Sequence, residues 1–465
     1  MKKSVAFLLI LVLTLGIFVA GCGGGKNANQ DTATNDPVEQ PDTNDKNENS
    51  EPAEEDSSPD KEAEVTSLIF WTFQELHKQF IDDAVLTWNE KNPDSPIELV
   101  TEVYSYDEMH NKLLIALQSG VGAPDIADIE ISKFANYLKG STPSLVPLND
   151  YIGSDIEYCV QARFDNYAKD GKYYGIDYHV GATVMFYNTE ILDQAGVDPK
   201  DIVTWDDYVE VGKKVVAETG IPMTTIEITD QWTLYPMISQ IGSDIFDSQG
   251  NIIIDNEDNI KVLQFLYDMV HKHKIAIPAP GGSHHAEEYF AFMNNGGAAS
   301  VLMPLWYMSR FVEYMPDLDG KITILPLPAW EEGGYRSAGM GGTGTVVTTQ
   351  SKHQDLAARF LAFAKVSREG AIKTWTMLGF DPIRWDVWDA PEMSADNKYT
   401  DYFGKGIFDM LLEIKDEIHP TNIPEIYPAA IDIIKRDVVF KSIREQSLTP
   451  EEALKEAANE LARQQ

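Results

Sequence analysis

Residues 67–71, Ser67-Leu68-Ile69-Phe70-Trp71, form a short apolar run after a long polar tract. Unbroken apolar runs of this length are typical of strands that are buried on both faces of a parallel sheet. A helical pattern follows, because apolar residues recur at intervals of four: Leu76, Phe80, Ala84 and Trp88. The pattern ends at Asn92-Pro93, since proline disfavours a helical conformation in the residue before it. The folded part of the chain is therefore expected to begin with a strand and a helix.

The same alternation continues along the chain. Strand-like runs occur at residues 97–104, 123–129 and 182–187, and residues 171–178 resemble a hairpin. The spacing of apolar residues predicts helices at 107–120, 205–218, 259–273, 354–366 and 450–463. Gly120 is expected to end the first of these helices, because glycine readily adopts the left-handed conformation found at helix C-termini. Strands that alternate with helices indicate an α/β fold with a doubly wound sheet.

Length and composition narrow the class of protein. A chain of 465 residues is expected to form two or more packed units, and 43% hydrophobic residues are enough to build their cores. The 74 acidic residues exceed the 37 basic ones, giving a formal charge of −37 that repels phosphate backbones, so nucleic acid is not expected as a partner. The two cysteines, Cys22 and Cys159, lie in such different contexts that no disulfide framework is proposed.

The N-terminus has the features of an export signal. Lys2 and Lys3 precede an apolar stretch over residues 5–20, which is shorter than the roughly 20 residues that a membrane-spanning helix needs. An uncleaved anchor helix is therefore the less favoured alternative. Val19-Ala20-Gly21-Cys22 resembles the lipobox of bacterial lipoproteins, in which the cysteine thiol receives a lipid. Residues 1–22 are thus predicted to be a lipoprotein signal peptide, with acyl chains on Cys22 anchoring the protein to the extracellular face of the cell membrane.

Residues 23–64 are predicted to be a disordered acidic linker. They contain three lysines and 13 carboxylates among Asn, Ser, Thr, Pro and Gly residues, a composition that cannot form a core. Charge repulsion extends such a coil, so that the segment can hold a folded domain away from a lipid surface. A solvated tail without a task is the alternative.

Beyond residue 65, short motifs follow one another in a characteristic order. They include the opening strand at 68–73, Trp-Asn-Glu-Lys-Asn-Pro at 88–93, Leu-Gln-Ser-Gly at 117–120, Ala-Pro-Asp-Ile at 123–126, Val-Pro-Leu-Asn-Asp-Tyr-Ile at 146–152, Gly-Lys-Tyr-Tyr-Gly-Ile at 171–176, Phe-Tyr-Asn at 186–188, Thr-Trp-Asp-Asp at 204–207, Gly-Ala-Ala at 297–299 and Gly-Gly-Thr-Gly at 341–344. In this order the chain resembles family 1 of the extracellular solute-binding proteins of ABC importers, which includes maltose-, oligosaccharide- and glycerol-phosphate-binding proteins.

The resemblance implies a periplasmic-binding-protein-like fold, in which two discontinuous α/β lobes surround a hinge and a ligand cleft. We expect an N-lobe of residues 65–180 plus 340–379 and a C-lobe of residues 181–339 plus 380–465. The chain would cross between them near 179–183, 339–343 and 379–383. The implied function is capture of a carbohydrate, an oligosaccharide or a sugar derivative, and its delivery to the transmembrane subunits of an ABC permease. We expect a monomer that is not an enzyme and uses no cofactor.

Candidate ligand contacts follow from the chemistry of sugars. Sugars present hydroxyl groups that need hydrogen-bond partners and C–H faces that pack on aromatic rings. Open sheets bind ligands at the carboxyl ends of their strands. The candidates at such ends in the first lobe are Trp71, Phe73, Gln74 and Glu130. A place in the core is an equal alternative for Trp71. In the second lobe, Asp230 and Trp232 follow the strand predicted at 224–229.

Further candidates depend on the resemblance. Trp306 matches the family's stacking tryptophan, although Pro304-Leu305 replace the usual glycine before it. Gly341 and Gly342 lack side chains, so their backbone amides can approach hydroxyl groups closely. His179 lies at the first crossing, where many relatives carry small or uncharged residues. Trp385 lies near the last crossing, where it either caps the cleft or packs in a core.

Metal binding, nucleotide binding and catalysis have weaker support in the sequence than sugar binding. His271, His273 and the pair His284-His285 lack the supporting ligands of a metal site, so no metal is expected. The glycines at 339–344 are not followed by the Lys-Ser/Thr of a phosphate loop, and Cys159 has no catalytic signature around it. A secreted glycoside hydrolase, which needs a pair of carboxylates, stays open as an alternative function. A ligand-sensing partner of a membrane receptor is the third possibility.

Overall fold

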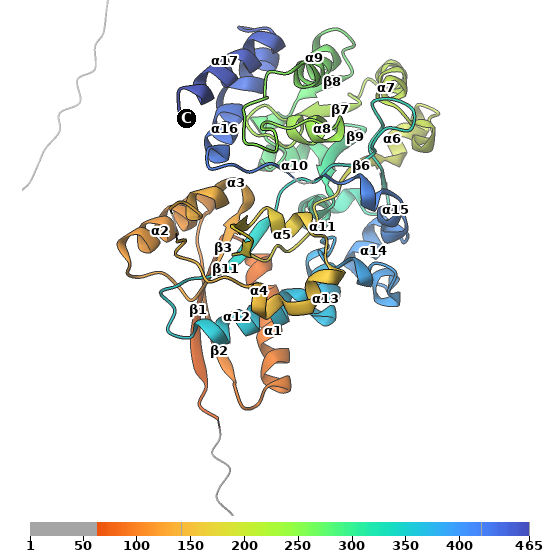
Figure 1. Ribbon diagram of the computed structural model, residues 1–465. Coiled ribbons are helices and arrows are strands. Elements are labelled where there is room, and N and C mark those ends of the chain that lie inside the picture. The colour runs from red at the N-terminus through yellow and green to blue at the C-terminus, as the bar shows by residue number, and fades with distance from the viewer. Residues whose placement is uncertain (1–62, 141, 420, 465) are drawn as a thin grey trace, which may run out of the picture. The chain divides into compact units, whose positions relative to one another are not determined.

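The computed structural model describes residues 63–140, 142–419 and 421–464, which Figure 1 traces as a coloured ribbon. The predicted signal peptide with Cys22, and the predicted linker up to residue 62, lie outside the described residues. Within the described part of the chain, none of the helices has both the length and the apolar character required to cross a membrane.

The described residues alternate between strands and helices, as the sequence predicts. The strands are β1 (Thr66–Thr72), β2 (Ile97–Val103), β3 (Ile126–Glu130), β4 (Ala168–Lys169), β5 (Lys172–Tyr173), β6 (Thr183–Asn188), β7 (Thr224–Ile226), β8 (Ala276–Pro278), β9 (Ser300–Pro304), β10 (Ile322–Leu325) and β11 (Thr343–Val347). The α-helices are α1 (Glu75–Lys91), α2 (Tyr106–Ser119), α3 (Ile131–Phe134), α4 (Asn149–Ile152), α5 (Ala162–Asp165), α6 (Thr189–Gln194), α7 (Trp205–Thr219), α8 (Leu234–Gln240), α9 (Glu257–His271), α10 (Glu287–Asn294), α11 (Met308–Tyr314), α12 (Gln354–Val366), α13 (Arg368–Leu378), α14 (Lys398–Phe403), α15 (Ile407–Ile414), α16 (Tyr427–Ile433) and α17 (Pro450–Ala462).

The first lobe is built on a four-stranded sheet in the order β11-β3-β1-β2. β1 pairs in parallel with both β2 and β3, so the strand and helix read from residues 67–93 are confirmed. α1 buries Phe80, Ile81 and Ala84 beneath this sheet. α12 and α13 come from the second half of the chain and pack against α1, as Figure 1 shows. The first lobe is therefore discontinuous in sequence.

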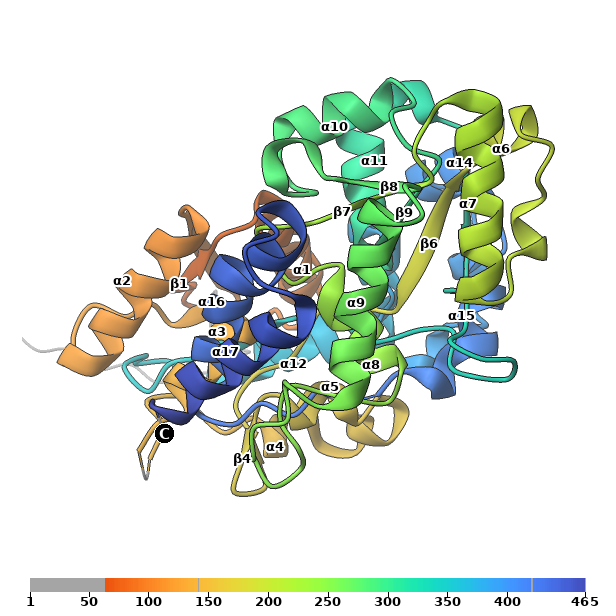
Figure 2. The same cartoon turned by 90° about the horizontal axis from the view of Figure 1, so that it is seen from above.

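The second lobe is built on a three-stranded sheet in the order β10-β6-β9, with the short parallel pair β7-β8 beside it. Both pairings of β6 are antiparallel. Helices α9 and α17 pack against each other although nearly two hundred residues separate them, and Figure 2 shows them side by side. One large core, which includes Leu263, Leu266 and Leu454, joins these helices to the sheet.

Two details of the predicted topology are wrong. The expected doubly wound parallel sheet is parallel only across β1, β2 and β3, whereas β11 runs antiparallel to β3. β11 enters the sheet directly at Thr343, opposite Glu130, which is where β3 ends, so no strand-helix-strand unit sets its direction. The predicted hairpin at 171–178 is shorter and earlier, because Asp170 and Gly171 take left-handed φ angles of 51° and 74° and form the turn between β4 and β5.

The three predicted crossing segments lie side by side. The amide of Val180 donates to the carbonyl of Asp381 at 2.9 Å, and the amide of Ala182 donates to the Asp381 side chain at 2.8 Å. The amide of Met340 donates to the carbonyl of Gly181 at 2.9 Å. Gly181 has a φ of 76°, and a Cβ at this position would collide with the Met340 carbonyl oxygen. Close packing of the crossings therefore requires glycine here.

A buried ion pair ties the crossings to the first lobe. Asp177 is 1% exposed and accepts hydrogen bonds from Arg163 Nε at 3.0 Å, Tyr167 at 2.8 Å and the Thr343 amide at 3.0 Å. Arg163 also donates to the carbonyl of Gly341 at 2.6 Å. Burial is the largest single influence and would raise the pKa of Asp177, but the charge of Arg163, together with other nearby positive charge and the hydrogen bond from the Thr343 amide, outweighs it and holds the pKa at about 2. The carboxylate is therefore ionised, and each of its oxygens has partners.

Cys159 is buried in the first lobe. Its side chain is 6% exposed, and its thiol contacts the carbonyl of Asp155 at 3.3 Å. Burial raises the pKa of this thiol to about 12. Because the thiolate is the reactive form of cysteine, this residue is protected from oxidation and alkylation at neutral pH.

The ion pair yields a prediction for stability. Arg163→Ala leaves Asp177 buried without its charge partner, so the free energy of unfolding should fall by about 3–5 kcal/mol. The control is Arg359→Ala, which removes an exposed ion pair with Asp355 and should cost at most about 1 kcal/mol. Urea denaturation of the two variants and the wild type measures both losses. Equal losses in the free energy of unfolding of the two variants would contradict the prediction that the buried ion pair stabilises the fold more than the exposed one.

Candidate functional site

A cavity of about 730 Å³ is lined by both lobes and by the crossing segments. The predicted ligand contacts that line it are Phe73, Gln74, Glu130, His179, Asp230, Trp232, Trp306, Gly341 and Gly342. These residues come from strand ends, loops and crossings that are far apart in the sequence. The structure thus brings most of the predicted residues to one place, while their role in binding stays a prediction.

Two tryptophans form an aromatic corner of the cavity. The ring centroids of Trp232 and Trp306 are 5.3 Å apart, and their planes are inclined by 80°. His285 stacks on Trp306 at 5.7 Å with an inclination of 16°. Trp306 is fixed by a hydrogen bond from its indole nitrogen to the carbonyl of Met340 at 3.2 Å. The corner therefore offers rigid ring faces suited to the C–H faces of a sugar.

Several buried polar atoms of the lining have no hydrogen-bond partner among the described residues. They are Glu130 Oε1, His179 Nδ1, Gln231 Oε1 and His285 Nε2. A buried polar atom without a partner costs free energy, and native proteins satisfy almost all such atoms. A ligand rich in hydroxyl groups can supply the missing partners, since each hydroxyl both donates and accepts.

Glu130 is held at the end of β3 by its neighbours. Its Oε2 accepts hydrogen bonds from the Tyr106 hydroxyl and the Ser132 amide, both at 2.9 Å, and it thereby caps the first turn of α3. Burial is the largest influence on this carboxyl group and raises its pKa. These bonds fix the orientation of the side chain, whose other oxygen, Oε1, has no hydrogen-bond partner among the described residues.

Both cations among the arginines and lysines of the lining are paired with carboxylates. Lys435 Nζ lies 3.0 Å from Asp230 Oδ2, and Arg310 Nη1 lies 3.5 Å from Glu313 Oε2. Lys435 is positioned by a π-helical turn over Ile434–Val438 that directly follows α16. Because these charges are compensated within the protein, the cavity suits a neutral polar ligand better than an ion.

The glycines of the last lining segment are required by close contacts. Gly341 has a φ of 76°, and a Cβ there would lie 3.1 Å from the Trp306 indole nitrogen. At Gly342, a Cβ would collide with the Arg163 guanidinium group. Larger residues at either position would displace the aromatic corner or the buried ion pair.

Two predicted ligand contacts are not at the cavity. Trp71 is 5% exposed and packs in the core of the first lobe, where its ring meets Tyr104 edge to face at 5.5 Å. Trp385 is 46% exposed and lies beside Tyr158. Its neighbour Trp388 is buried. The core alternative therefore fits Trp71, and Trp385 lies at the surface away from the lining.

Sequence reasoning missed part of the lining. His285 lines the cavity, whereas its sequence context, a histidine pair in a glycine-rich loop, does not point to a ligand contact. Among the described residues, no group of three or more His, Cys, Asp or Glu side chains is arranged to hold a metal ion. Lys435, Arg310 and Tyr106 were not singled out. Arg310 and Glu313 are three positions apart on one face of α11, shortly after Trp306, and this spacing is the signal that could have found part of this set.

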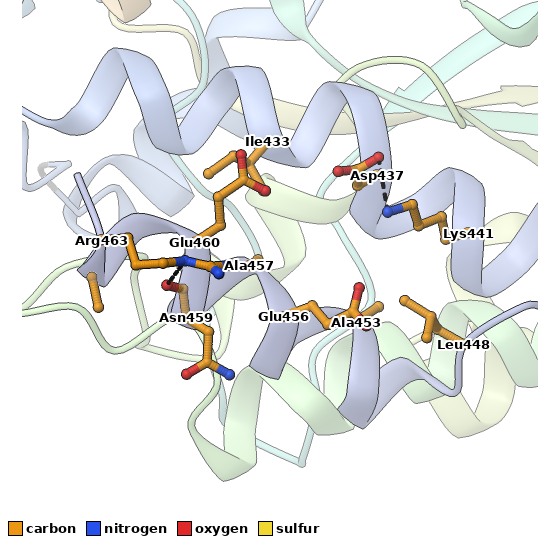
Figure 3. Close-up of a pocket in the computed structure, with 11 residues that line it drawn as sticks. Ile433, Asp437, Lys441, Leu448, Ala453, Glu456, Ala457, Asn459, Glu460 and Arg463 are labelled. Atoms are coloured by element: carbon orange, nitrogen blue, oxygen red, sulfur yellow. Dashed lines mark hydrogen bonds and ion pairs between the residues drawn. The ribbon is translucent and has the colours of Figure 1, made fainter.

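A second cavity of about 570 Å³ lies among the C-terminal helices, where Figure 3 shows it between α17 and the segment that follows α16. Lys441 Nζ lies 3.3 Å from Asp437 Oδ1 at its edge. None of the described residues that line it is aromatic, and none of the predicted ligand contacts is among them. The cavity with the aromatic corner is therefore the candidate binding site.

Residues 71–369 match the sequence pattern of the family described as bacterial extracellular solute-binding protein. The chain belongs to this family. The family and the α/β fold predicted from the motif order are thus confirmed. In this solute-binding protein, residues 341–343 of the Gly-Gly-Thr-Gly motif line the cavity, and the motif at 88–93 lies at the end of α1.

Two relatives are similar over most of the chain. The arabinooligosaccharide-binding protein of Halalkalibacterium halodurans is 56% identical over 393 residues, which cover 84% of this chain and 88% of the relative. The arabinooligosaccharide-binding protein of Bacillus subtilis is 50% identical over 463 residues, or 99% of both chains. The predicted role as a carbohydrate-binding component of an ABC importer agrees with these relatives, which are binding proteins by name.

A solved structure supports the fold of this solute-binding protein. The ABC transporter associated binding protein from B. animalis subsp. lactis, in complex with beta-1,6-galactobiose, superposes with a TM-score of 0.71 at 22% identity. The match covers 86% of this chain and 97% of that chain. The two α/β lobes are therefore the common architecture.

His179, a residue of the cavity lining, makes the stability of this solute-binding protein depend on pH. It is 6% exposed, and burial lowers its pKa to about 3, while an unfolded histidine takes up a proton near pH 6.5. Above about pH 6.5 the histidine is neutral in the folded and the unfolded protein, so its full contribution to stability is present. As the pH falls from about 6.5 toward 3, only the unfolded state takes up the proton, and the free energy of unfolding falls by up to about 1.4 kcal/mol per pH unit.

We therefore predict that His179→Gln reduces the sensitivity of the protein to acid. Between about pH 7 and pH 5, the drop in the free energy of unfolding should be about 2 kcal/mol smaller in this variant than in the wild type. Urea denaturation at the two pH values provides the measurement. The exposed His353 supplies the control variant His353→Gln, which should keep the wild-type drop. A drop in His179→Gln that equals that of the wild type would refute the prediction.

Proposed function

We propose that this protein captures an arabinooligosaccharide outside the cell and delivers it to the transmembrane subunits of an ABC importer. The observation that carries the proposal is the aromatic corner of Trp232 and Trp306 next to buried polar atoms without partners. This combination matches the C–H faces and hydroxyl groups of a sugar. The choice of arabinose oligomers rests on the names of the two relatives at 56% and 50% identity.

Capture is proposed to close the two lobes around the sugar. In this proposal the lobes comprise residues 65–180 plus 340–379 and residues 181–339 plus 380–465, and the three crossings form the hinge. The cavity lining supports this mechanism, since Glu130 comes from the first lobe and Trp232 and Trp306 from the second. A ligand that contacts both lobes binds the closed form more tightly than the open form, and this difference shifts the equilibrium toward closure.

We propose that the sugar leaves unchanged. The alternative, a glycoside hydrolase, requires two carboxyl groups free to act as acid and as base or nucleophile across the scissile bond. In this cavity Glu130 accepts hydrogen bonds from Tyr106 and Ser132, and Asp230 is paired with Lys435. Because both carboxylates already have hydrogen-bond or ion-pair partners, they are better suited to binding the sugar than to catalysis. The relatives are also named as binding proteins.

The proposed setting is the outer face of the cell membrane. Membership of an extracellular solute-binding family supports export, and Val19-Ala20-Gly21-Cys22 supports attachment through lipid on Cys22. Acyl chains contribute roughly 0.8 kcal/mol per buried methylene, so two or more chains give a stable anchor. The protein is proposed to act as a monomer, tethered by residues 23–64 within reach of its permease.

Trp306→Ala is predicted to weaken sugar binding, whereas Trp385→Ala is not. Loss of the stacking face at Trp306 should lower the affinity for an arabinooligosaccharide by about tenfold or more, equivalent to about 1.4 kcal/mol. Trp385 lies outside the cavity lining and provides the matched control. Calorimetric titration measures the affinities, and a sugar-dependent rise in melting temperature provides a second readout.

The same experiment tests the proposal as a whole. The recovered sugar should be intact after incubation with the wild-type protein. New reducing ends would support the hydrolase instead, and failure of the wild type to bind any arabinooligosaccharide would overturn the choice of ligand.

Cys22→Ala is predicted to release the protein from the membrane. Without the cysteine thiol there is no attachment point for lipid, so the protein should shift from the membrane fraction to the culture medium. Cell fractionation followed by immunoblotting checks this outcome. Cys159→Ala is the control and should leave the distribution unchanged, because its thiol is buried in the folded lobe. A Cys22→Ala protein that has lost residues 1–21 and still stays with the membrane would contradict lipid anchoring.

A further inference from the structure

One face of α11 continues the cavity wall beyond the aromatic corner. Trp306 lies just before the helix, and cavity-lining residues then recur three or four positions apart: Ser309, Arg310, Glu313 and Tyr314. Residues at these spacings share one face of a helix. The opposite face, with Met308 and Phe311, is buried in the core of the second lobe. The lining face is therefore directed away from the core along the whole helix.

Tyr314 provides a second aromatic surface at the end of this face. Its ring stacks on Phe290 of α10 with a centroid distance of 4.7 Å and an inclination of 6°. Phe290 is 9% exposed, whereas Tyr314 is 50% exposed. Only one face of the Tyr314 ring can be covered by Phe290, so this tyrosine has ring surface open to solvent at the cavity. The stacked pair holds that surface in a fixed orientation.

The separation of the two aromatic surfaces fits a chain of sugar units. Trp306, in the 3-10 turn just before α11, and Tyr314, the last residue of α11, are eight positions apart, which corresponds to a backbone rise of about 12 Å at 1.5 Å per residue. This distance exceeds the width of one sugar ring. Between the two rings, the Arg310–Glu313 pair supplies donors and acceptors for hydroxyl groups. The backbone positions of the two aromatic residues are therefore spaced for successive units of a linear oligomer rather than for one monosaccharide.

We propose that Tyr314, supported by Phe290, forms an outer subsite that holds a distal unit of the captured oligosaccharide. The inference rests on the proposed function, because it assigns the same cavity to a longer ligand. Trp306 then binds a unit that every oligomer possesses, whereas Tyr314 contributes only when the chain is long enough to reach it. The subsite therefore sets the preference of the protein for chain length.

Calorimetric titration with arabinooligosaccharides of increasing length, from the disaccharide to the hexasaccharide, tests the subsite. Tyr314→Ala should lower the affinity for the long oligomers about tenfold and leave the affinity for the disaccharide unchanged. Tyr314→Phe retains the ring and should keep the wild-type affinities. Trp306→Ala should weaken binding at every length. Tyr335→Ala is the matched control, since Tyr335 is 43% exposed and lies outside the cavity lining.

The possible outcomes separate the two proposals. A loss that is equal at all lengths, or no loss at any length, in Tyr314→Ala overturns the outer subsite while the proposed function stands. A wild-type protein that binds none of the oligomers overturns the proposed function and the subsite with it. Melting temperatures without sugar verify folding, and Tyr314→Gln, with the same expected pattern, replaces Tyr314→Ala if the latter does not fold.

Discussion

The hydrogen bonds of the Asp177 carboxylate determine how the cavity is assembled. This buried group binds Arg163 and Tyr167 of the first lobe and the amide of Thr343 in the returning crossing. Arg163 in turn holds the carbonyl of Gly341. The segment that contacts Trp306 is thereby positioned from the first lobe, although Trp306 belongs to the second. A buried carboxylate is costly without its partners, and for this reason the contact imposes one geometry on the crossings.

The cavity combines rigidity with incomplete hydrogen bonding. Its rings are fixed by stacking and by the bond from Trp306 to Met340, and its Lys435 and Arg310 side chains are paired with carboxylates. The buried atoms without partners, such as Gln231 Oε1 and His285 Nε2, are the exception. A polar ligand gains the hydrogen bonds that the protein lacks, while it pays little to reorganise the walls. Specificity then comes from the positions of these atoms rather than from the size of the cavity alone.

The spacing of apolar residues in the sequence predicted the strands and helices whose positions depend on the burial of one face. The apolar run at 67–71 and the spacing from Leu76 to Trp88 identified β1 and α1, because burial of one face imposes a regular spacing. The predicted doubly wound arrangement does not hold for β11, because the direction of this strand depends on where the chain returns from the other lobe. Strand-end reasoning located Glu130 and Trp232 but could not separate Trp71 from them, because a tryptophan at the same strand end satisfies either the core or a ligand. His285 reaches the cavity through tertiary packing, which its neighbours in sequence do not reveal.

The buried state of Cys159 has a practical consequence. Its protonated thiol is shielded from maleimides and similar dyes, so a cysteine introduced at an exposed cavity-rim position such as Gln79 would be the reactive thiol among the described residues. A fluorophore attached there would sense the change in its surroundings as sugar enters. The part of the chain that the structure describes could thus be made into a reagentless optical sensor by one added cysteine.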